Sequence, residues 1–168
     1  MRGRRRSSAV SLLLPPIGAL LLAVTPQAAA GAPKAIRTVE ATATLKEVGD
    51  DFEQVRVLSG ARQSAALAQA QQSLEQVLRG GVDGDRRAAA HFLAGSIAFE
   101  LGDYVHAGAQ YREAAAGLGN GPFADDADYA AIEALEASGD DLGAACEWVK
   151  WEKRHPTSPL VPVARLKL

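Results

Sequence analysis

Residues 86–122 and 123–159 read RRAAAHFLAGSIAFELGDYVHAGAQYREAAAGLGNGP and FADDADYAAIEALEASGDDLGAACEWVKWEKRHPTSP, and these two stretches decide the fold. They match each other at a constant offset of 37 residues, which aligns Gly102 with Gly139, Ala107 with Ala144 and Pro122 with Pro159. A fixed period in this range is typical of helical hairpins that stack on one another. The sequence therefore predicts an all-α fold.

Apolar and alanine residues recur at helical spacing on both sides of each Gly-Asp pair. We expect helices over 86–101 and 104–116 in the first stretch, over 123–138 and 142–155 in the second, and over 61–79 before them. Glycine ends one helix in the left-handed conformation and aspartate caps the next. Asp85 is the expected cap of the helix at 86–101, and Ser158 with Pro159 is expected to begin a third unit.

The two units resemble tetratricopeptide repeats. Each repeat of that family has a small residue midway along its first helix, a Gly-acid-aromatic turn, and alternating small and aromatic residues in its second helix. The first unit carries Gly95, Gly102, Asp103, Tyr104, Ala107, Tyr111 and Ala114 at these places, and the second carries Ile132, Gly139, Asp140, Asp141, Ala144, Trp148, Trp151 and Pro156. Ile132 and Trp151 replace small residues of the pattern. The resemblance covers about residues 86–168 and implies a short right-handed superhelix of antiparallel hairpins.

The resemblance also implies that the first helices line a groove for a protein or peptide partner. The groove residues would be Ala89, Phe92, Ser96, Phe99 and Glu100 from one unit and Asp126, Tyr129, Glu133 and Glu136 from the next. These side chains are aromatic and acidic, so a basic or apolar partner segment fits them. The alternative is that Phe92 and Tyr129 are ordinary core residues.

A second resemblance is to the helical-repeat region of soluble lytic transglycosylases, in which short "SPLADYA" and "P-x-SPL" phrases recur. Its counterparts here are PFAD at 122–125 and PTSPL at 156–160. The sequence lacks the Glu-Ser pair of the catalytic domain of those enzymes. This similarity implies a cell-envelope setting, with peptidoglycan as an alternative partner.

The first 30 residues are typical of a secretory signal peptide. Four arginines precede an apolar run, and Ala28, Ala29 and Ala30 form a small-residue cleavage site. Cleavage after Ala30 would leave no membrane-spanning segment, and we expect export to the periplasm or the medium. The alternative of an uncleaved anchor is disfavoured by the proline pair in a short apolar run.

Residues 31–60 are expected to form a flexible or partly helical leader before a repeat domain at 61–168. Pro33 and two threonines argue against a firm helix over 31–43. Helical spacing appears only from Leu45 to Val55.

Charge and composition exclude several classes of function. Removing the four arginines of residues 1–30, which hold no acidic residue, leaves 14 basic and 20 acidic side chains, a net charge of −6. A domain of this charge does not attract nucleic-acid phosphates or anionic membranes. No cofactor or metal is predicted, because His91, His106 and His155 lack the spacing of metal ligands. The sequence therefore favours a binding protein over an enzyme.

Two further features have simple structural interpretations. Asp125, Asp126 and Asp128 are expected to provide favourable charge at a helix N-terminus. Cys146, the only cysteine, is expected to be buried and inert.

The last helix is predicted to have an apolar face without a partner helix after it, formed by Leu160, Val163, Leu166 and Leu168. A terminal repeat normally needs a polar outer surface. This end is therefore expected either to pair with another chain, for example in a homo-oligomer, or to continue in a longer protein.

Overall fold

The structure is a computed structural model that describes the backbone of residues 32–168 and the side chains of residues 44–168. The expected signal peptide at 1–30 lies outside the described residues. Residues 32–168 form seven α helices, one short 3-10 helix and no β strand, so the predicted all-α class is confirmed. The helices are α2 Ala32–Val55, α3 Gly60–Arg79, α4 Gly84–Glu100, α5 Tyr104–Leu118, α6 Ala124–Ala137, α7 Asp141–Arg154 and α8 Val161–Ala164, followed by the 3-10 helix η2 Arg165–Lys167.

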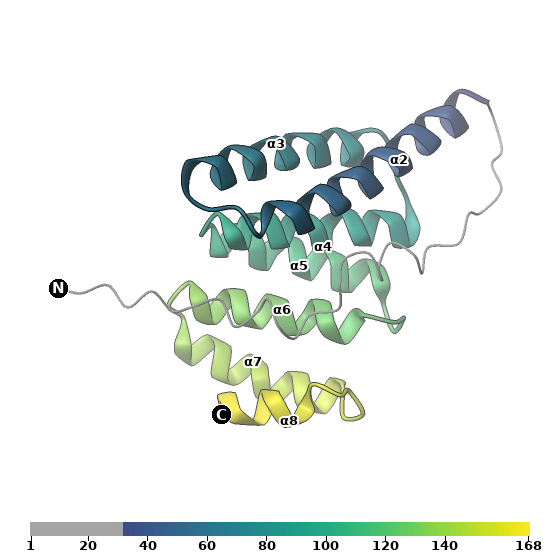
Figure 1. Ribbon diagram of the computed structural model, residues 1–168. Helices are drawn as coiled ribbons and strands as arrows, with labels where there is room; N and C mark the ends of the chain where they lie inside the picture. The colour runs from purple at the N-terminus through teal and green to yellow at the C-terminus, as the bar shows by residue number, and fades with distance from the viewer. Residues whose placement is uncertain (1–31) are drawn as a thin grey trace.

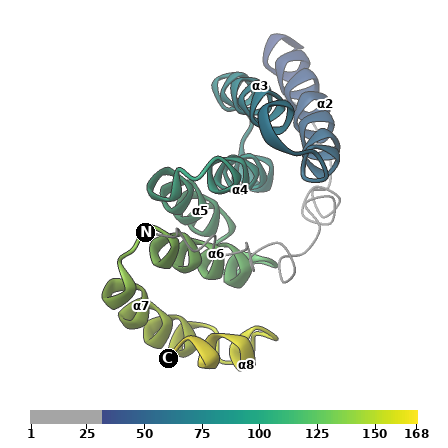
Figure 2. The ribbon, with the colours of Figure 1, turned by 60° about the vertical axis from the view of Figure 1, so that its left-hand side comes forward.

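The helices stack as consecutive antiparallel hairpins, α2 with α3, α4 with α5 and α6 with α7 (Figure 1). Neighbouring hairpins touch through α3 against α4 and through α5 against α6. Seen along the helices, the stack bends into an arc with α2, α4, α6 and α8 along its inner side and α3, α5 and α7 along its outer side (Figure 2). We call these two sets the inner row and the outer row.

The turn within each of the two later hairpins forms as the sequence predicts. Gly102 and Gly139 have φ angles of 82° and 97°, the left-handed conformation that glycine adopts without strain. Asp103 then caps α5 by accepting a hydrogen bond from the backbone N–H of His106 at 3.2 Å, and Asp140 caps α7 through the equivalent bond at 2.9 Å. The left-handed glycine and the capping aspartate therefore both recur at the 37-residue spacing that the sequence shows.

Small residues allow α4 and α5 to pack closely. Ala107 and Ala114 of α5 are fully buried, and the Tyr111 ring between them lies directly over Gly95 of α4. A β-carbon built on Gly95 would be only 2.7 Å from Tyr111 Cδ1, so no larger residue fits there without movement.

Residues 32–55 form one continuous helix, which corrects the expectation of a leader without a firm helix over 31–43. Pro33 does not prevent it, because a proline in the first turn of a helix loses no intrahelical hydrogen bond. The second half of α2 is fixed by burial of Leu45, Val48, Phe52 and Val55. The stacked fold therefore begins before residue 61.

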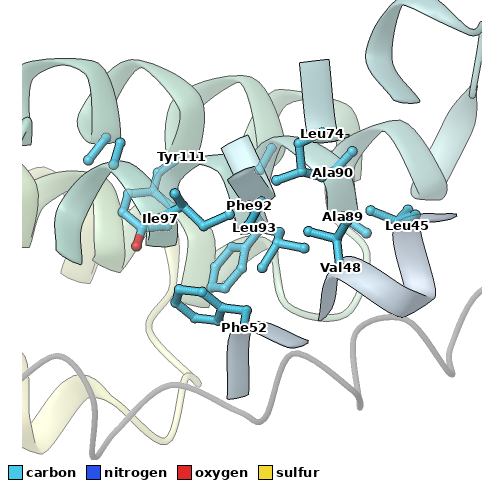
Figure 3. Close-up of a cluster of buried hydrophobic side chains, with 14 of the residues drawn as sticks. Leu45, Val48, Phe52, Leu74, Ala89, Ala90, Phe92, Leu93, Ile97 and Tyr111 are labelled. Carbon is cyan, nitrogen blue, oxygen red and sulfur yellow. The ribbon is translucent and has the colours of Figure 1, made fainter. Parts of the chain in front are cut away.

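Two hydrophobic cores follow one another along the stack. The larger core joins α2, α3, α4 and α5 to one face of α6; Figure 3 shows its centre, with side chains from α2 to α5 converging. The smaller core joins the opposite face of α6 to α7 and α8; its members are Tyr129, Ile132, Ala144, Trp148, Trp151, Leu160, Val161 and Ala164. Helix α6 thus contributes to both cores.

Two expected helix starts are corrected. Helix α4 begins at Gly84, so Asp85 lies in its first turn and does not cap it. Ser158 accepts a hydrogen bond from the backbone N–H of Leu160 at 3.2 Å, which closes a turn, and α8 starts only at Val161.

The predicted apolar face of the last helix is also corrected. Leu160 is buried before α8 begins, whereas Leu166 and Leu168 are 86% and 61% exposed. The reason is that α8 has four residues and gives way to the 3-10 helix η2, whose three-residue turn changes the direction of later side chains.

Candidate functional site

The residues predicted to line a groove separate into a buried group and an acidic group. Phe92 is 2% exposed and its ring packs edge-on against Tyr111, with ring centroids 5.3 Å apart. Ser96 is also buried; its hydroxyl donates to the Phe92 carbonyl at 3.1 Å and accepts from the Tyr111 hydroxyl at 3.2 Å. Phe92 and Ser96 are therefore buried between α4 and α5 and do not line an open groove.

Tyr129 is fully buried and holds the smaller core together. Its ring lies 4.6 Å from that of Trp148 and 5.6 Å from that of Trp151, measured between centroids. The Trp151 indole N–H donates to the backbone carbonyl of Asp125 at 3.1 Å, which ties α7 to the start of α6. Tyr129 is thus a core residue, the alternative that the sequence left open.

Phe99 and Glu100 at the end of α4 remain partly exposed. The Phe99 ring packs edge-on against Tyr104 of α5, with centroids 5.0 Å apart. Burial raises the pKa of the Tyr111 hydroxyl, the hydrogen bond with Ser96 lowers it, the charges of Glu133 and Glu100 raise it further, and the charge of Arg56 lowers it. Carboxylates from two inner-row helices therefore lie around one buried phenol.

Glu133 and Glu136 of α6 share one cation. Lys167 Nζ lies 3.0 Å from Glu136 Oε2, which accepts a hydrogen bond from it, and 3.5 Å from Glu133 Oε1. Lys167 lies in η2, the segment after α8, so it links these two carboxylates of α6 to the C-terminal end of the stack. We call Glu100, Glu133 and Glu136 the acidic inner face.

Burial dominates the electrostatics of this face. Desolvation raises the pKa of Glu133 to about 6, although the positive charge of the nearby Lys167 ammonium acts in the opposite direction. Burial also lowers the pKa of the Lys167 ammonium, but its hydrogen bond to Glu136 and the two nearby carboxylates outweigh that effect and leave the pKa raised. Burial, together with the charges of Glu133 and Glu136, raises the pKa of Tyr129.

The three neighbouring aspartates have different surroundings. Asp125 and Asp126 lie in the first turn of α6, as expected, and burial raises the pKa of Asp126 to about 6. Asp128 instead accepts hydrogen bonds from Arg154 and, at 2.8 Å, from His155 Nε2. The expectation for Asp128 was wrong because it lies one turn further along α6, where it faces the end of α7.

A cavity of about 790 Å³ lies between the end of α5, the start of α6 and the end of α7. Its wall mixes apolar residues with charged ones, which are Arg112, Asp125, Asp128, Arg154 and His155. Parts of both phrases that resemble lytic transglycosylase repeats line it, namely Ala124, Asp125, Thr157, Ser158 and Pro159. Segments more than thirty residues apart in the sequence thus meet at one cavity.

Cys146 is exposed, so the prediction of a buried thiol was wrong. The buried face of α7 contains Ala144 and Trp148, and a residue midway between two such positions points to the opposite side of the helix. Whether Cys146 is buried or exposed could not be inferred from its residue type alone.

Within residues 44–168 no group of three or more His, Cys, Asp or Glu side chains is placed to hold a metal ion. His91 lies 2.8 Å from Gln110 Oε1 through Nδ1 and joins α4 to α5. None of the helices in the described part of the chain is long and apolar enough to cross a membrane.

Comparison with known proteins finds no matching family model, no matching curated protein and no matching solved structure.

Sequence reasoning did not identify Lys167 as part of the candidate site. A lysine beside exposed leucines near the end of the sequence carries no signal of its own. Its role arises only because η2 brings it to α6, 31 residues away in sequence from Glu136.

Proposed function

We propose that this chain is an exported, non-catalytic interaction scaffold of the tetratricopeptide type, which holds a basic segment of a protein partner against its inner row of helices. The acidic inner face carries this proposal: Glu100, Glu133 and Glu136 come from two consecutive inner-row helices and gather around buried tyrosines. Opposite charge steers a basic segment to such a surface and fixes its register.

Export is proposed from residues 1–30, whose arginines, apolar run and alanine triplet match a secretory signal. We place the mature protein in the bacterial periplasm. Expression of the full chain in a Gram-negative host, followed by N-terminal sequencing of the protein from a periplasmic extract, tests this placement. We expect the mature sequence to start at Gly31; a full-length chain retained in the membrane would contradict cleavage.

Site-specific photo-crosslinking tests the scaffold function. A photoreactive residue is placed at Glu100 or Glu136 on the inner row, and at Val105 or Leu142 on the outer row as matched controls. Val105 and Leu142 are 75% and 80% exposed, so access does not limit the controls. We expect one discrete protein adduct from the inner positions only. Equal adducts from both rows, or adducts from the outer row alone, would contradict a partner on the inner row.

A second candidate function is favoured by the 790 Å³ cavity, because both phrases that resemble lytic transglycosylase repeats line it. In this alternative the chain is the helical-repeat part of a peptidoglycan-processing protein that lacks its catalytic domain. Sedimentation with purified sacculi tests it, comparing Arg112→Ala in the cavity with Arg62→Ala on the exposed side of α3. Saturable binding lost only in Arg112→Ala would support this function, and no sedimentation of the wild type would exclude it.

A further inference from the structure

The Glu133 carboxylate is buried with incomplete compensation of its charge. Its side chain is only 4% exposed, yet Lys167, the one cation in ion-pair contact with it among residues 44–168, lies 3.5 Å from Oε1 and donates its hydrogen bond to Glu136. The second oxygen, Oε2, is buried without a hydrogen-bond partner. A buried ionised group normally has its hydrogen bonds satisfied. Glu133 therefore has acceptor capacity that this arrangement does not use.

A second unused polar atom lies beside it. The Tyr129 hydroxyl is buried without a hydrogen-bond partner, one helical turn from Glu133, and the charges of Glu133 and Glu136 both act on it. The Tyr129 hydroxyl, which can donate or accept, thus lies one helical turn from Glu133 on α6. Among residues 44–168, Lys167 is the only cation in ion-pair contact with the Glu133 or Glu136 carboxylate.

Lys167 can leave this cluster at little cost to the core. Its segment η2 contributes no buried residue, and Leu166 and Leu168 on either side of it are mostly exposed. Arg165 holds the segment to α7 by donating to Glu152 from Nε at 2.8 Å and from Nη2 at 2.6 Å, independently of α6. The Lys167 side chain can therefore turn away while η2 stays attached.

We propose that Glu133 and Glu136 form a receptor for one guanidinium group, supplied by an arginine in a basic partner segment, and that Lys167 is the internal competitor for this receptor. This inference rests on the proposed scaffold function and identifies the contact that a partner makes.

Guanidinium fits the receptor better than ammonium for a geometric reason. It carries five N–H donors in a flat fork, which can pair with both oxygens of one carboxylate and still donate to a second. Glu136 Oε2 and Glu133 Oε1, which lie 3.0 and 3.5 Å from Lys167 Nζ, offer two acceptors around one cation position, whereas the Lys167 ammonium makes one hydrogen bond of normal length. Arginine is also less strongly hydrated than lysine, which lowers the cost of burying it.

Fluorescence anisotropy of the full chain with a labelled peptide of repeating glycine, serine and arginine tests the receptor. The same peptides with citrulline or lysine in place of arginine are the comparison probes. We expect Lys167→Ala to lower the Kd for the arginine peptide up to about fivefold, the range of a partly exposed ion pair. We expect Glu133→Gln and Glu136→Gln to raise the Kd about tenfold or more.

Matched substitutions separate local effects from general charge effects. Lys150→Ala removes a lysine that pairs with Glu147 on the outer row at 2.6 Å, and Glu113→Gln removes an exposed carboxylate of α5. Both are expected to leave the Kd unchanged. Circular dichroism melting of each variant checks folding, and Glu136→Gln, which removes only a part-buried carboxylate, keeps the test decisive if Glu133→Gln unfolds.

The proposed guanidinium receptor is contradicted if the citrulline or lysine peptide binds as tightly as the arginine peptide. It is also contradicted if Lys167→Ala leaves the Kd for the arginine peptide unchanged. It is also overturned if no peptide binds to either the wild type or Lys167→Ala. Each of these results leaves the scaffold function standing, because photo-crosslinking from Glu100 and Glu136 is scored separately with the natural partner.

Discussion

At the scale of single residues, Gly95 sets how closely α4 approaches α5. We expect Gly95→Ala to lower the free energy of unfolding by about 1 to 3 kcal/mol, the usual cost of overpacking a core. The added β-carbon would lie 2.7 and 2.8 Å from two atoms of the Tyr111 ring, which is 1% exposed and cannot easily move. Urea unfolding followed by circular dichroism measures the change.

Gly108 provides the matched control for Gly95. It also lies inside a helix, but a β-carbon there would meet its nearest atoms at 3.6 Å, an ordinary contact. Gly108→Ala should therefore gain about 0.5 to 1 kcal/mol from helix propensity. Equal effects of the two substitutions would show that Tyr111 does not limit the approach.

Glu133 makes stability depend on pH. Its folded-state pKa of about 6 lies above the ordinary value of 4.5, so the native state binds the proton more tightly than the unfolded chain. The contribution of Glu133 to the free energy of unfolding is fully present below pH 4.5. It is lost as the pH rises through about 6, which lowers the free energy of unfolding by about 1 to 2 kcal/mol. Chemical unfolding at pH values from 4 to 8 measures it.

The Glu133→Gln variant isolates this effect from other titrating groups. Because glutamine does not ionise, the stability of the variant minus that of the wild type should rise between about pH 4 and pH 7. A flat difference for Glu133→Gln would mean that the Glu133 carboxylate is not desolvated.

At the scale of helices, α2 is a structural part of the first hairpin. Phe52 is 2% exposed within the larger core, so we expect Phe52→Ala to lower the free energy of unfolding by about 3 to 5 kcal/mol. Urea unfolding measures the loss.

Val57, which follows α2 and is 84% exposed, gives the control for this experiment. Val57→Ala should change stability by less than about 0.5 kcal/mol. If Phe52→Ala were equally harmless, residues 32–55 would have to be reinterpreted as a leader that does not pack on α3 and α4.

At the scale of the whole molecule, the two cores give the stack two units of different size. Both tryptophans of the sequence, Trp148 and Trp151, lie in the smaller core. We expect the tryptophan fluorescence transition in urea to precede the far-ultraviolet circular dichroism transition. Each unit of a helical stack touches only its neighbours, so α7 and α8 can detach while the larger core stays intact.

Coincident transitions would contradict this order of unfolding. They would show that α6, whose two faces belong to different cores, couples the units so strongly that neither opens alone. The outcome therefore measures how far the stack behaves as a chain of independent units.

The extent of sequence-based prediction can be judged from particular residues. The turns at Gly102 and Gly139 and the caps at Asp103 and Asp140 were predictable, because each depends on a few consecutive residues. The exposure of Cys146 was not predictable, because it depends on which side of α7 meets the smaller core. The same limitation applied to Tyr129, which two interpretations fitted equally well.

The sequence by itself determined the helices from α3 to α7, the turns at Gly102 and Gly139 and the period at which the hairpins stack, since helix propensity, capping and glycine conformation act over a few neighbouring residues. The tertiary structure alone decided that residues 32–55 join the stack, that Tyr129 belongs to the core and that Lys167 meets Glu133 and Glu136. These depend on contacts between helices that are distant in sequence, and burial in such contacts sets the charge balance of the acidic inner face.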